Sequence, residues 1–252
     1  MRYNEESFTK FLKEIDLQKY KDQYSKIKTV EMDLPRNIQA LDTIYNLYWN
    51  KTQIPQQENN LPLSFDEFYN IYYNDLENNI NEFWEKTGFE KECSCFKNGL
   101  KARIYRTWAS LITQIHAGYV AESVFGIGNV EMSTLLDHQG VDMLIHYKNN
   151  DIKVQIKKDS KRPEISRMHS IDDNSSNDIF NIWYIVPSPH DYENPFYSIR
   201  TRAGELRDCN KQFKKFNDNG TLDRLDNGFV IFTTKEFELI KETFDKKEEQ
   251  NA

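Results

Sequence analysis

The chain has 252 residues, of which 38% are hydrophobic and 29% charged, and its formal net charge at pH 7 is −7. This apolar content excludes wholesale disorder, and no apolar run approaches the ~18 residues that a membrane span needs. Residues 1–6 are too polar for a signal peptide, and three cysteines do not make a disulfide framework, so we expect a soluble, cytoplasmic protein without membrane contacts.

The charge is unevenly distributed along the chain. Residues 97–170 carry eleven Lys and Arg against seven Asp and Glu, whereas the segments on either side are acidic. Because distant charge is screened over ~8–10 Å, a locally basic zone is compatible with binding a polyanion. Taken alone, the count is better explained by a chance excess over a window of this length.

The first third of the chain is predicted to be helical. Apolar residues recur at mostly helical spacing in residues 5–24, and the polar residues 51–62, with two prolines, are predicted to form a loop. Ser64 and Glu67 fit a capping box that begins another helix. We therefore expect an N-terminal helical region, residues 1–96, packed on a core formed by residues 97–252.

The core is predicted to mix helix and strand. One apolar face runs along residues 108–124, and the glycines at 126 and 128 end that helix. The predicted strands are residues 141–147, 151–158, 180–186 and 228–233. The first two form an antiparallel hairpin, because adjacent asparagines in their short connection tolerate left-handed conformations. A closing helix begins at a capping box, Thr233–Glu236. The fold class is therefore α/β.

The segment 137–158 holds the residue types that phosphodiester hydrolysis requires. On the strand 151–158, Gln155 and Lys157 share one face, while Asp142 and Asp137 lie at and before the start of the preceding strand. Carboxylate oxygens hold Mg²⁺, and a lysine stabilises negative charge that develops on the phosphoryl group. The alternative is an ordinary solvated strand face protected by lysines, and the spacing alone does not decide between the two.

Glu122 adds one carboxylate to the apolar stripe of the preceding helix. Such a group is costly on a core-facing stripe unless it is paired or binds a cation. It either points toward the same site or ends the stripe at the surface, and the sequence leaves both interpretations open.

These residues resemble the core of the PD-(D/E)xK nucleases, with Asp142 as the motif aspartate and Gln155-Ile-Lys157 as the (D/E)-x-K element. More specifically, the chain resembles the TaqI-type restriction endonucleases over nearly its whole length. The motifs that carry this resemblance are residues 24–36 (YSKIKTVEMDLPR), 45–49 (YNLYW), 137–142 (DHQGVD) and 154–159 (VQIKKD).

The resemblance implies a restriction-endonuclease-like mixed β-sheet and a Mg²⁺-dependent type II endonuclease that cuts double-stranded DNA at a short palindrome, TCGA. In this interpretation Asp142 is the principal metal ligand and Lys157 the catalytic lysine. Asp137 is a second acidic participant, and Glu122 is a possible further ligand. A twofold-symmetric target implies a homodimer on DNA, and a restriction system implies a cognate DNA methyltransferase.

The sequence departs from the family pattern at two positions of the motif. Val141 replaces the usual proline, and Gln155 occupies the position of the acidic residue. An amide oxygen can ligate Mg²⁺ but brings no charge, so neutralisation would depend on the carboxylates. Lys158 could replace Lys157 only if a bulge turned it to the same face.

Basic residues that could contact DNA phosphates or bases flank the motif. The candidates are Lys101, Arg103, Arg106, Lys161, Arg162, Arg167, Arg200 and Arg202, each of which could equally be a solvated surface residue. We assign Trp84, Trp108 and Trp183 to core packing rather than to base stacking. Two alternatives to a restriction enzyme remain: a repair or junction-resolving nuclease of the same core, and a non-catalytic DNA-binding protein on a decayed core, suggested by Gln155.

Overall fold

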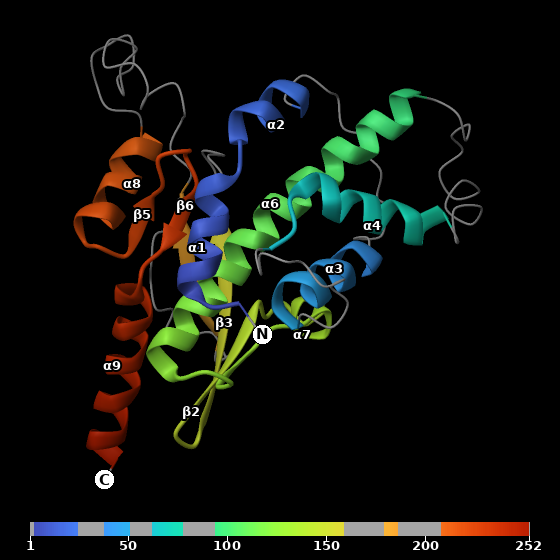
Figure 1. Cartoon of the computed structure of the whole chain (residues 1–252). Coiled ribbons are helices and arrows are strands. Elements are labelled where there is room, and N and C mark those ends of the chain that lie inside the picture. Colours follow the sequence, from blue (N-terminus) through green and yellow to red (C-terminus); the bar gives the residue numbers. More distant parts are fainter. Residues whose placement is uncertain are drawn as a thin grey trace. The chain divides into compact units, whose positions relative to one another are not determined.

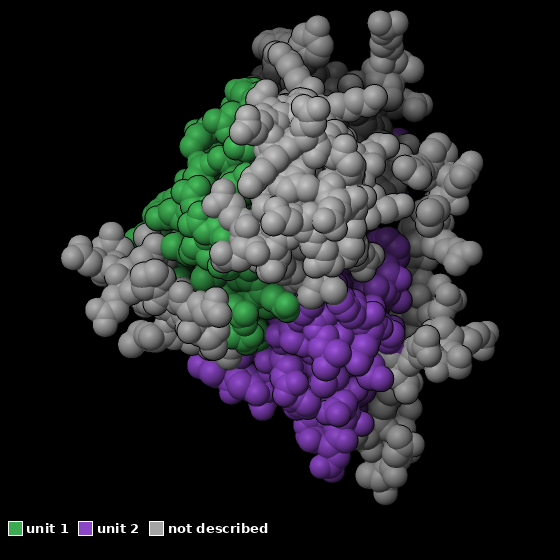
Figure 2. Space-filling view, turned by 90° about the vertical axis from the view of Figure 1, so that its right-hand side faces the viewer, with its two compact units in different colours: residues 1–115 green, residues 116–252 purple. Residues whose placement is uncertain are grey.

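The fold was analysed in a computed structural model, which describes residues 3–24, 38–50, 62–77, 94–158, 179–185 and 208–251. The chain divides into two compact units, Met1–Ile115 and His116–Ala252, which Figure 2 draws in different colours. The division falls inside the long helix α6 (Ser94–Phe125). Our expected division into residues 1–96 and 97–252 stays a prediction.

The described part of the first unit is entirely helical (Figure 1). Its elements are α1 (Glu5–Glu14), α2 (Leu17–Tyr24), α3 (Ile38–Ile44), the π-helix η1 (Tyr45–Asn50), α4 (Phe65–Glu77) and the first part of α6. The predicted helical stretch 5–24 is broken after Ile15, because the Asp16 side chain accepts the Lys19 N–H (2.8 Å) and so begins a second helix. The predicted loop 51–62 lies almost wholly outside the described residues.

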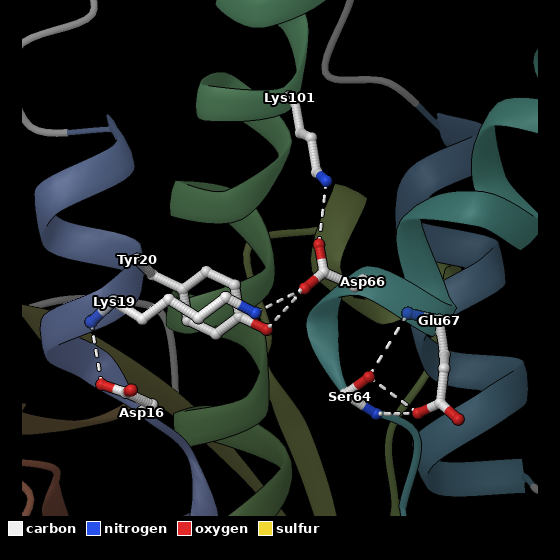
Figure 3. Close-up of polar contacts among 7 residues, drawn as sticks. All are labelled: Asp16, Lys19, Tyr20, Ser64, Asp66, Glu67 and Lys101. Carbon is white, nitrogen blue, oxygen red and sulfur yellow. Dashed lines mark hydrogen bonds and ion pairs between the residues drawn. The ribbon is translucent and has the colours of Figure 1, made fainter.

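The predicted capping box at the start of α4 is confirmed (Figure 3). The Ser64 N–H donates to Glu67 Oε2 (2.8 Å), and the Glu67 N–H donates to Ser64 Oγ (3.3 Å). These reciprocal bonds satisfy two backbone donors that the first helical turn leaves free. Serine and glutamate at this spacing therefore fix where α4 begins.

The core of the first unit is built from aromatic rings around Trp108 of α6. This side chain is fully buried and contacts Phe11, Tyr20 and Phe65, the last with 5.3 Å between ring centroids. Its indole N–H donates to the Tyr48 hydroxyl (2.9 Å), which in turn donates to the Leu63 carbonyl. The polar tips of the two rings are thus satisfied within the core, as burial requires. The assignment of Trp108 to core packing is confirmed.

The second unit contains a four-stranded mixed sheet. Its strands are β1 (Val130–Glu131), β2 (Met143–Tyr147), β3 (Asn150–Lys158) and β4 (Ile179–Tyr184), in the spatial order β1-β2-β3-β4. The first two pairings are antiparallel, and β3 pairs with β4 in parallel. The predicted β2–β3 hairpin is confirmed, although the left-handed conformation falls on Lys148 (φ 53°) rather than on an asparagine.

One face of this sheet is apolar and covered by helices. Its buried residues are Val130, Met143, Ile145, Ile152, Val154, Ile156, Ile182 and Tyr184. The end of α6 reaches this side through Phe125, whose ring packs on Tyr147 of β2 (5.3 Å between centroids). The helix α9 (Thr234–Asn251) packs there through Phe244, which contacts Phe180 of β4 (5.3 Å). The residues that alternate with the buried ones along each strand lie on the opposite, more polar face.

The C-terminal part of the unit adds α8 (Asp208–Asp218) and a small antiparallel pair, β5 (Leu222–Arg224) and β6 (Val230–Phe232). The strand expected within 228–233 is confirmed as β6. The capping box predicted at Thr233 is wrong, because the Thr233 hydroxyl donates to the Gly220 carbonyl and Glu236 pairs with Thr221. The α/β fold class is confirmed. None of the helices within the described ranges is long and apolar enough to span a bilayer.

Candidate active site

The central strand β3 carries two of the predicted site residues and is regular along its length. Its register with β4 runs without interruption from the Lys153–Ile179 pair to the Lys158–Tyr184 pair. Val154 and Ile156 are buried, whereas Gln155 and Lys157, which alternate with them, are partly exposed. Because alternate residues of a strand face opposite sides, Gln155 and Lys157 share the polar face and Lys158 does not. The bulge that would exchange the two lysines is absent from this stretch.

Asp142 lies at the start of β2 and is bound to β3 by two hydrogen bonds. Its backbone N–H donates to the Val154 carbonyl (3.0 Å), and its Oδ2 accepts the backbone N–H of Ile156 (2.5 Å). Only 7% of the residue is exposed. The peptide N–H that it accepts lies between Gln155 and Lys157 along the chain, so the carboxylate is held at the level of those two residues. A hydrogen bond to a carboxylate is stronger than one between neutral groups, so this position is firmly held.

A tight turn places Gln155 next to the residues that precede Asp142. Gly140 has a left-handed backbone (φ 78°), and a Cβ on it would lie 3.9 Å from Gln155 Nε2. Asp137 is in α7 (Thr134–His138), a short helix capped by Ser133, and its carbonyl accepts the Gly140 N–H (3.0 Å). Asp137 thus lies before β2, as expected, but in a short helix that the sequence analysis did not predict and that the Ser133 cap begins.

Glu122 does not end its helix at the surface, since only 5% of it is exposed. Its Oε1 accepts the N–H of Gly128 (3.1 Å), in the loop that follows α6. The neighbouring Asn129 carbonyl accepts the His146 N–H, near the end of β2 that is opposite to Asp142. The described residues contain no group of three or more His, Cys, Asp or Glu that could hold a metal ion, so Glu122, Asp137 and Asp142 are not gathered into one cluster.

The ammonium of Lys157 lies over an aromatic ring. Its Nζ is 5.6 Å from the ring centroid of Trp183, the residue that pairs with it in β4. The assignment of Trp183 to core packing is wrong, because this side chain is only partly buried and lies opposite the apolar face. The sequence holds a signal for this position: Trp183 alternates with Ile182 and Tyr184, which fill the core. Trp84 lies outside the described residues.

Lys158, on the other face of β3, is in a different environment. Lys158 is exposed to solvent, but the surrounding residues partly desolvate its ammonium and so lower the pKa of this group. A lysine in such surroundings loses its proton more easily than an ordinary surface lysine. It pairs in register with the buried Tyr184, away from Gln155 and Asp142.

The basic residues that were candidates for DNA contacts differ in how far they are already engaged. The Lys101 Nζ binds Asp66 Oδ1 (2.8 Å), as Figure 3 shows. The same nitrogen lies 5.1 Å from the Tyr69 ring centroid. Asp66 also accepts from Lys19 (3.2 Å), and its pKa lies below the usual range: burial raises it, but these lysine bonds outweigh the burial. Arg103 and Arg106 are exposed on α6. Lys161, Arg162, Arg167, Arg200 and Arg202 lie outside the described residues.

One polar cluster was missed by the sequence analysis. His146 of β2 uses both ring nitrogens, with Nδ1 2.7 Å from Asp151 and Nε2 3.2 Å from Glu131. These hydrogen bonds, the Asp151 bond first, raise the pKa of the imidazole. The cross-strand pairing of His146 with Asp151 follows from the hairpin register. That register depends on a turn of two residues, 148–149, whereas the expected strands left three residues, 148–150, between them.

Comparisons with known proteins agree with one another. A family model described as TaqI restriction endonuclease matches residues 5–244. The chain is 32% identical over 228 residues to the type II restriction enzyme TaqI of Thermus aquaticus, covering 90% of this chain and 82% of that protein. It is 32% identical over 235 residues to the type II restriction enzyme TthHB8I of Thermus thermophilus, with the same coverage of 90% and 82%. No solved structure matches the chain.

Proposed function

The chain belongs to the TaqI restriction endonuclease family, and from this premise we propose that it is a type II enzyme that hydrolyses phosphodiester bonds of double-stranded DNA at TCGA, with Mg²⁺ as its cofactor. The observation that carries the proposal is the Asp142 carboxylate, bound to the Ile156 N–H between Gln155 and Lys157. We infer that the carboxylate, the amide and the ammonium act together along this short stretch of β3.

The residues at this position fit a magnesium ion by their chemistry. Asp142 offers a carboxylate, one oxygen of which accepts the Ile156 N–H, and Gln155 offers the oxygen of an amide whose nitrogen lies beside the Gly140 turn. Oxygen donors of this kind are the ligands that Mg²⁺ prefers, with waters completing its shell. Bound Mg²⁺ would polarise the phosphoryl group and lower the pKa of a bound water. Asp137, in α7 just before Asp142, is the better candidate for further negative charge, because Glu122 binds Gly128 near the opposite end of β2.

Lys157 would act directly on the reacting phosphate. Its ammonium shares the polar face with Gln155, where it can donate to a phosphate oxygen as negative charge develops there. Lys158 extends toward the apolar side of β3 and so lacks access to the same phosphate. We therefore assign the catalytic role to Lys157.

Affinity for DNA would come mainly from contacts to phosphates. The exposed Arg103 and Arg106 are the described residues best suited to this, together with the arginines and lysine of residues 161–167 and 200–202. Lys101 would have to leave Asp66 to contribute. A palindromic target fits a homodimer, whose twofold axis would coincide with that of the DNA. A cognate methyltransferase would protect the host DNA of this cytoplasmic system.

A second candidate function rests on Gln155. An amide in the place of the acidic motif residue removes one negative charge from the metal site, which is how a core that binds DNA without cutting it would arise. A repair or junction-resolving nuclease would keep the same residues but choose its substrate by DNA structure.

One experiment separates these functions. A supercoiled plasmid with several TCGA sites is incubated with the protein and Mg²⁺, beside the Asp142→Asn variant as control. Fragments whose ends map to TCGA, made by the wild type alone, support the restriction enzyme. Cutting that follows branched or damaged DNA regardless of sequence supports the repair nuclease. Binding without cleavage in both Mg²⁺ and Mn²⁺ supports the decayed core.

A further inference from the structure

The contact between Lys157 and Trp183 joins two neighbouring strands on the polar face of the sheet. The two residues are register partners in the parallel β3–β4 pair, and the ammonium nitrogen lies 5.6 Å from the indole ring centroid. Attraction between a cation and the face of an aromatic ring operates within about 6 Å and is strongest for tryptophan. The geometry is therefore that of a cation–π contact.

The position of Trp183 is not explained by core packing. Its neighbours in β4, Ile182 and Tyr184, are 3% and 4% exposed and fill the apolar side, whereas Trp183 faces the other way and is only partly buried. The exposed Asn181 lies two residues earlier on the same side. Trp183 thus lies on the polar side of β4, where its register partner is Lys157.

Among the described residues, four other lysines lie over aromatic rings, and each also binds an oxygen acceptor; for Lys241, over the Tyr147 ring, this is the Val124 carbonyl (3.4 Å). Lys19 and Lys101 lie over aromatic rings too, but both also form ion pairs with Asp66. Lys148 lies over Tyr147 and pairs with Asp245. Within the part of the chain that the structure describes, Lys157 has the ring as its partner and forms no ion pair. Its charge is oriented but not neutralised.

This difference matters for a lysine that acts on phosphate. A carboxylate partner would cancel the positive charge and occupy the N–H donors, so the lysine would have to break an ion pair before it could stabilise a phosphate. The face of an aromatic ring attracts the ammonium through its quadrupole, without an acceptor atom that would occupy the N–H groups in hydrogen bonds. It can thus restrict the four-carbon side chain while leaving the N–H groups available.

We propose that Trp183 is a positioning residue that holds the Lys157 ammonium, through the face of its indole ring, in place for the reacting phosphate. This inference rests on the proposed function of the Asp142 site. It predicts that the ring acts through its π-electrons, and not merely as a filler of space. Loss of the ring should slow the chemical step and leave DNA binding largely unchanged.

The first test compares Trp183→Phe with Trp183→Leu. Leucine has no π face, whereas phenylalanine keeps one. We expect the single-turnover cleavage rate, at saturating protein, to fall about tenfold in Trp183→Leu and by about threefold or less in Trp183→Phe, the range that cation–π contacts reach. The affinity for duplex DNA, measured with Ca²⁺ in place of Mg²⁺, should stay within about twofold in both. Equal rates in the two variants would overturn the proposal.

The second test changes the electronics of the ring and not its shape. Protein is produced with 5-fluorotryptophan and then with 5,7-difluorotryptophan, since each fluorine weakens the negative potential of the ring face. The wild-type cleavage rate should fall stepwise with fluorination. The Trp183→Phe variant, which keeps Trp49, Trp84 and Trp108, should show no such trend and is the matched control. A parallel decline in both proteins contradicts the inference.

The third test does not depend on cleavage, so it separates this inference from the proposed function. The ring current of Trp183 should move the ε-methylene proton resonances of Lys157 upfield in the wild-type protein. The displacement should disappear in Trp183→Leu, and the resonances are assigned by their loss in Lys157→Arg. If the resonances are unshifted in the wild type, the inference fails even in an active enzyme. If they shift and no DNA is cut, only the proposed function fails.

Discussion

The Asp142 carboxylate accepts the backbone N–H of Ile156 at 2.5 Å, so the residue proposed as the principal metal ligand also joins β2 to β3. The two roles use different properties of the side chain. Binding a divalent cation requires the negative charge, whereas the bond to Ile156 requires only an acceptor oxygen. Substitutions can therefore separate them.

Asp142→Asn should abolish cleavage while keeping most of the stability, because an amide oxygen can still accept the Ile156 N–H. Asp142→Ala should abolish cleavage and also lower the free energy of unfolding by about 1–3 kcal/mol, because it leaves a buried N–H without an acceptor. Urea denaturation of both variants measures the difference. Equal stabilities would show that the bond to Ile156 contributes nothing.

Lys157→Ala should lose cleavage and keep DNA binding, whereas Lys158→Ala should keep both. The physical reason is the regular register of β3, which turns the two side chains to opposite faces. Cleavage rates in Mg²⁺ and binding affinities in Ca²⁺ test the pair. The opposite result, with Lys158 required and Lys157 dispensable, would mean that β3 shifts by one residue when DNA binds.

Gln155→Glu should lower the Mg²⁺ concentration that gives half-maximal cleavage, because a carboxylate adds charge to a site that now has an amide. Without metal the same substitution should destabilise the protein, because two carboxylates would then repel each other. Residue 155 directly precedes Ile156, whose N–H the Asp142 carboxylate accepts. Thermal unfolding with and without Mg²⁺ measures this effect. Gln155→Ala is the control, and a metal requirement unchanged in both variants excludes Gln155 from the metal site.

Stability should fall in mild acid because of His116. Burial lowers the pKa of this imidazole from its usual 6.5 to about 4, and the side chain is 1% exposed. As the pH drops below 6.5 the unfolded chain binds a proton that the folded protein takes up only near pH 4. The loss should therefore begin near pH 6.5 and approach roughly 3 kcal/mol near pH 4. In His116→Gln this part of the pH dependence should be absent from urea denaturation curves.

His146 provides a control of opposite sign. The hydrogen bonds to Asp151 and Glu131 raise its pKa, so its contribution to stability is full below pH 6.5 and is lost as the pH rises through the raised pKa. The effect should be small, because the imidazole is 37% exposed, its two carboxylate partners are largely exposed, and solvent screens the interaction. If His116→Gln and His146→Gln change the pH profile in the same direction, the assignment of these two groups is wrong.

Arg103 and Arg106 should contribute to DNA binding through charge alone. Replacing both by alanine should reduce the slope of log affinity against log salt by up to about 2, since each phosphate contact contributes about 0.9. Lys101→Ala should instead destabilise the first unit, because it removes the bond to Asp66. Binding titrations at several salt concentrations, with urea denaturation beside them, distinguish the two effects. If Lys101→Ala changed the salt dependence of DNA affinity and left the stability unchanged, Lys101 would be a DNA-contacting residue.

Local patterns in the sequence predicted local structure well. The capping box at Ser64 and the β2–β3 hairpin depend on residues a few positions apart, and the structure confirms both. The helix expected over residues 108–124 is confirmed as part of α6, but its single apolar face is wrong, because α6 is buried on nearly all sides from Leu111 to Glu122. The positions of Gln155 and Lys157 on one face follow from the alternation of a single strand. These features need no knowledge of distant contacts.

Contacts between distant segments could not be predicted in the same way. The hydrogen bond between Glu122 and the Gly128 N–H could not be predicted from the sequence, because it depends on how the loop after α6 folds back. Trp183 was assigned to the core because sequence alone does not fix which face of β4 is buried. The register of a parallel pair is set by a long crossover connection and not by a turn.

The two-residue turn between β2 and β3 also has a consequence for the order of folding. Closing so short a loop costs little entropy, and hairpins form in about 1–10 μs, so Asp142 should meet Ile156 early. The connection from β3 to β4 spans residues 159–178, so Trp183 should reach Lys157 only afterwards. Pulse-labelling hydrogen exchange should then find the Ile156 amide protected before the amides of β4. The metal ligand would thus be in place first, and the aromatic partner of the lysine would arrive last.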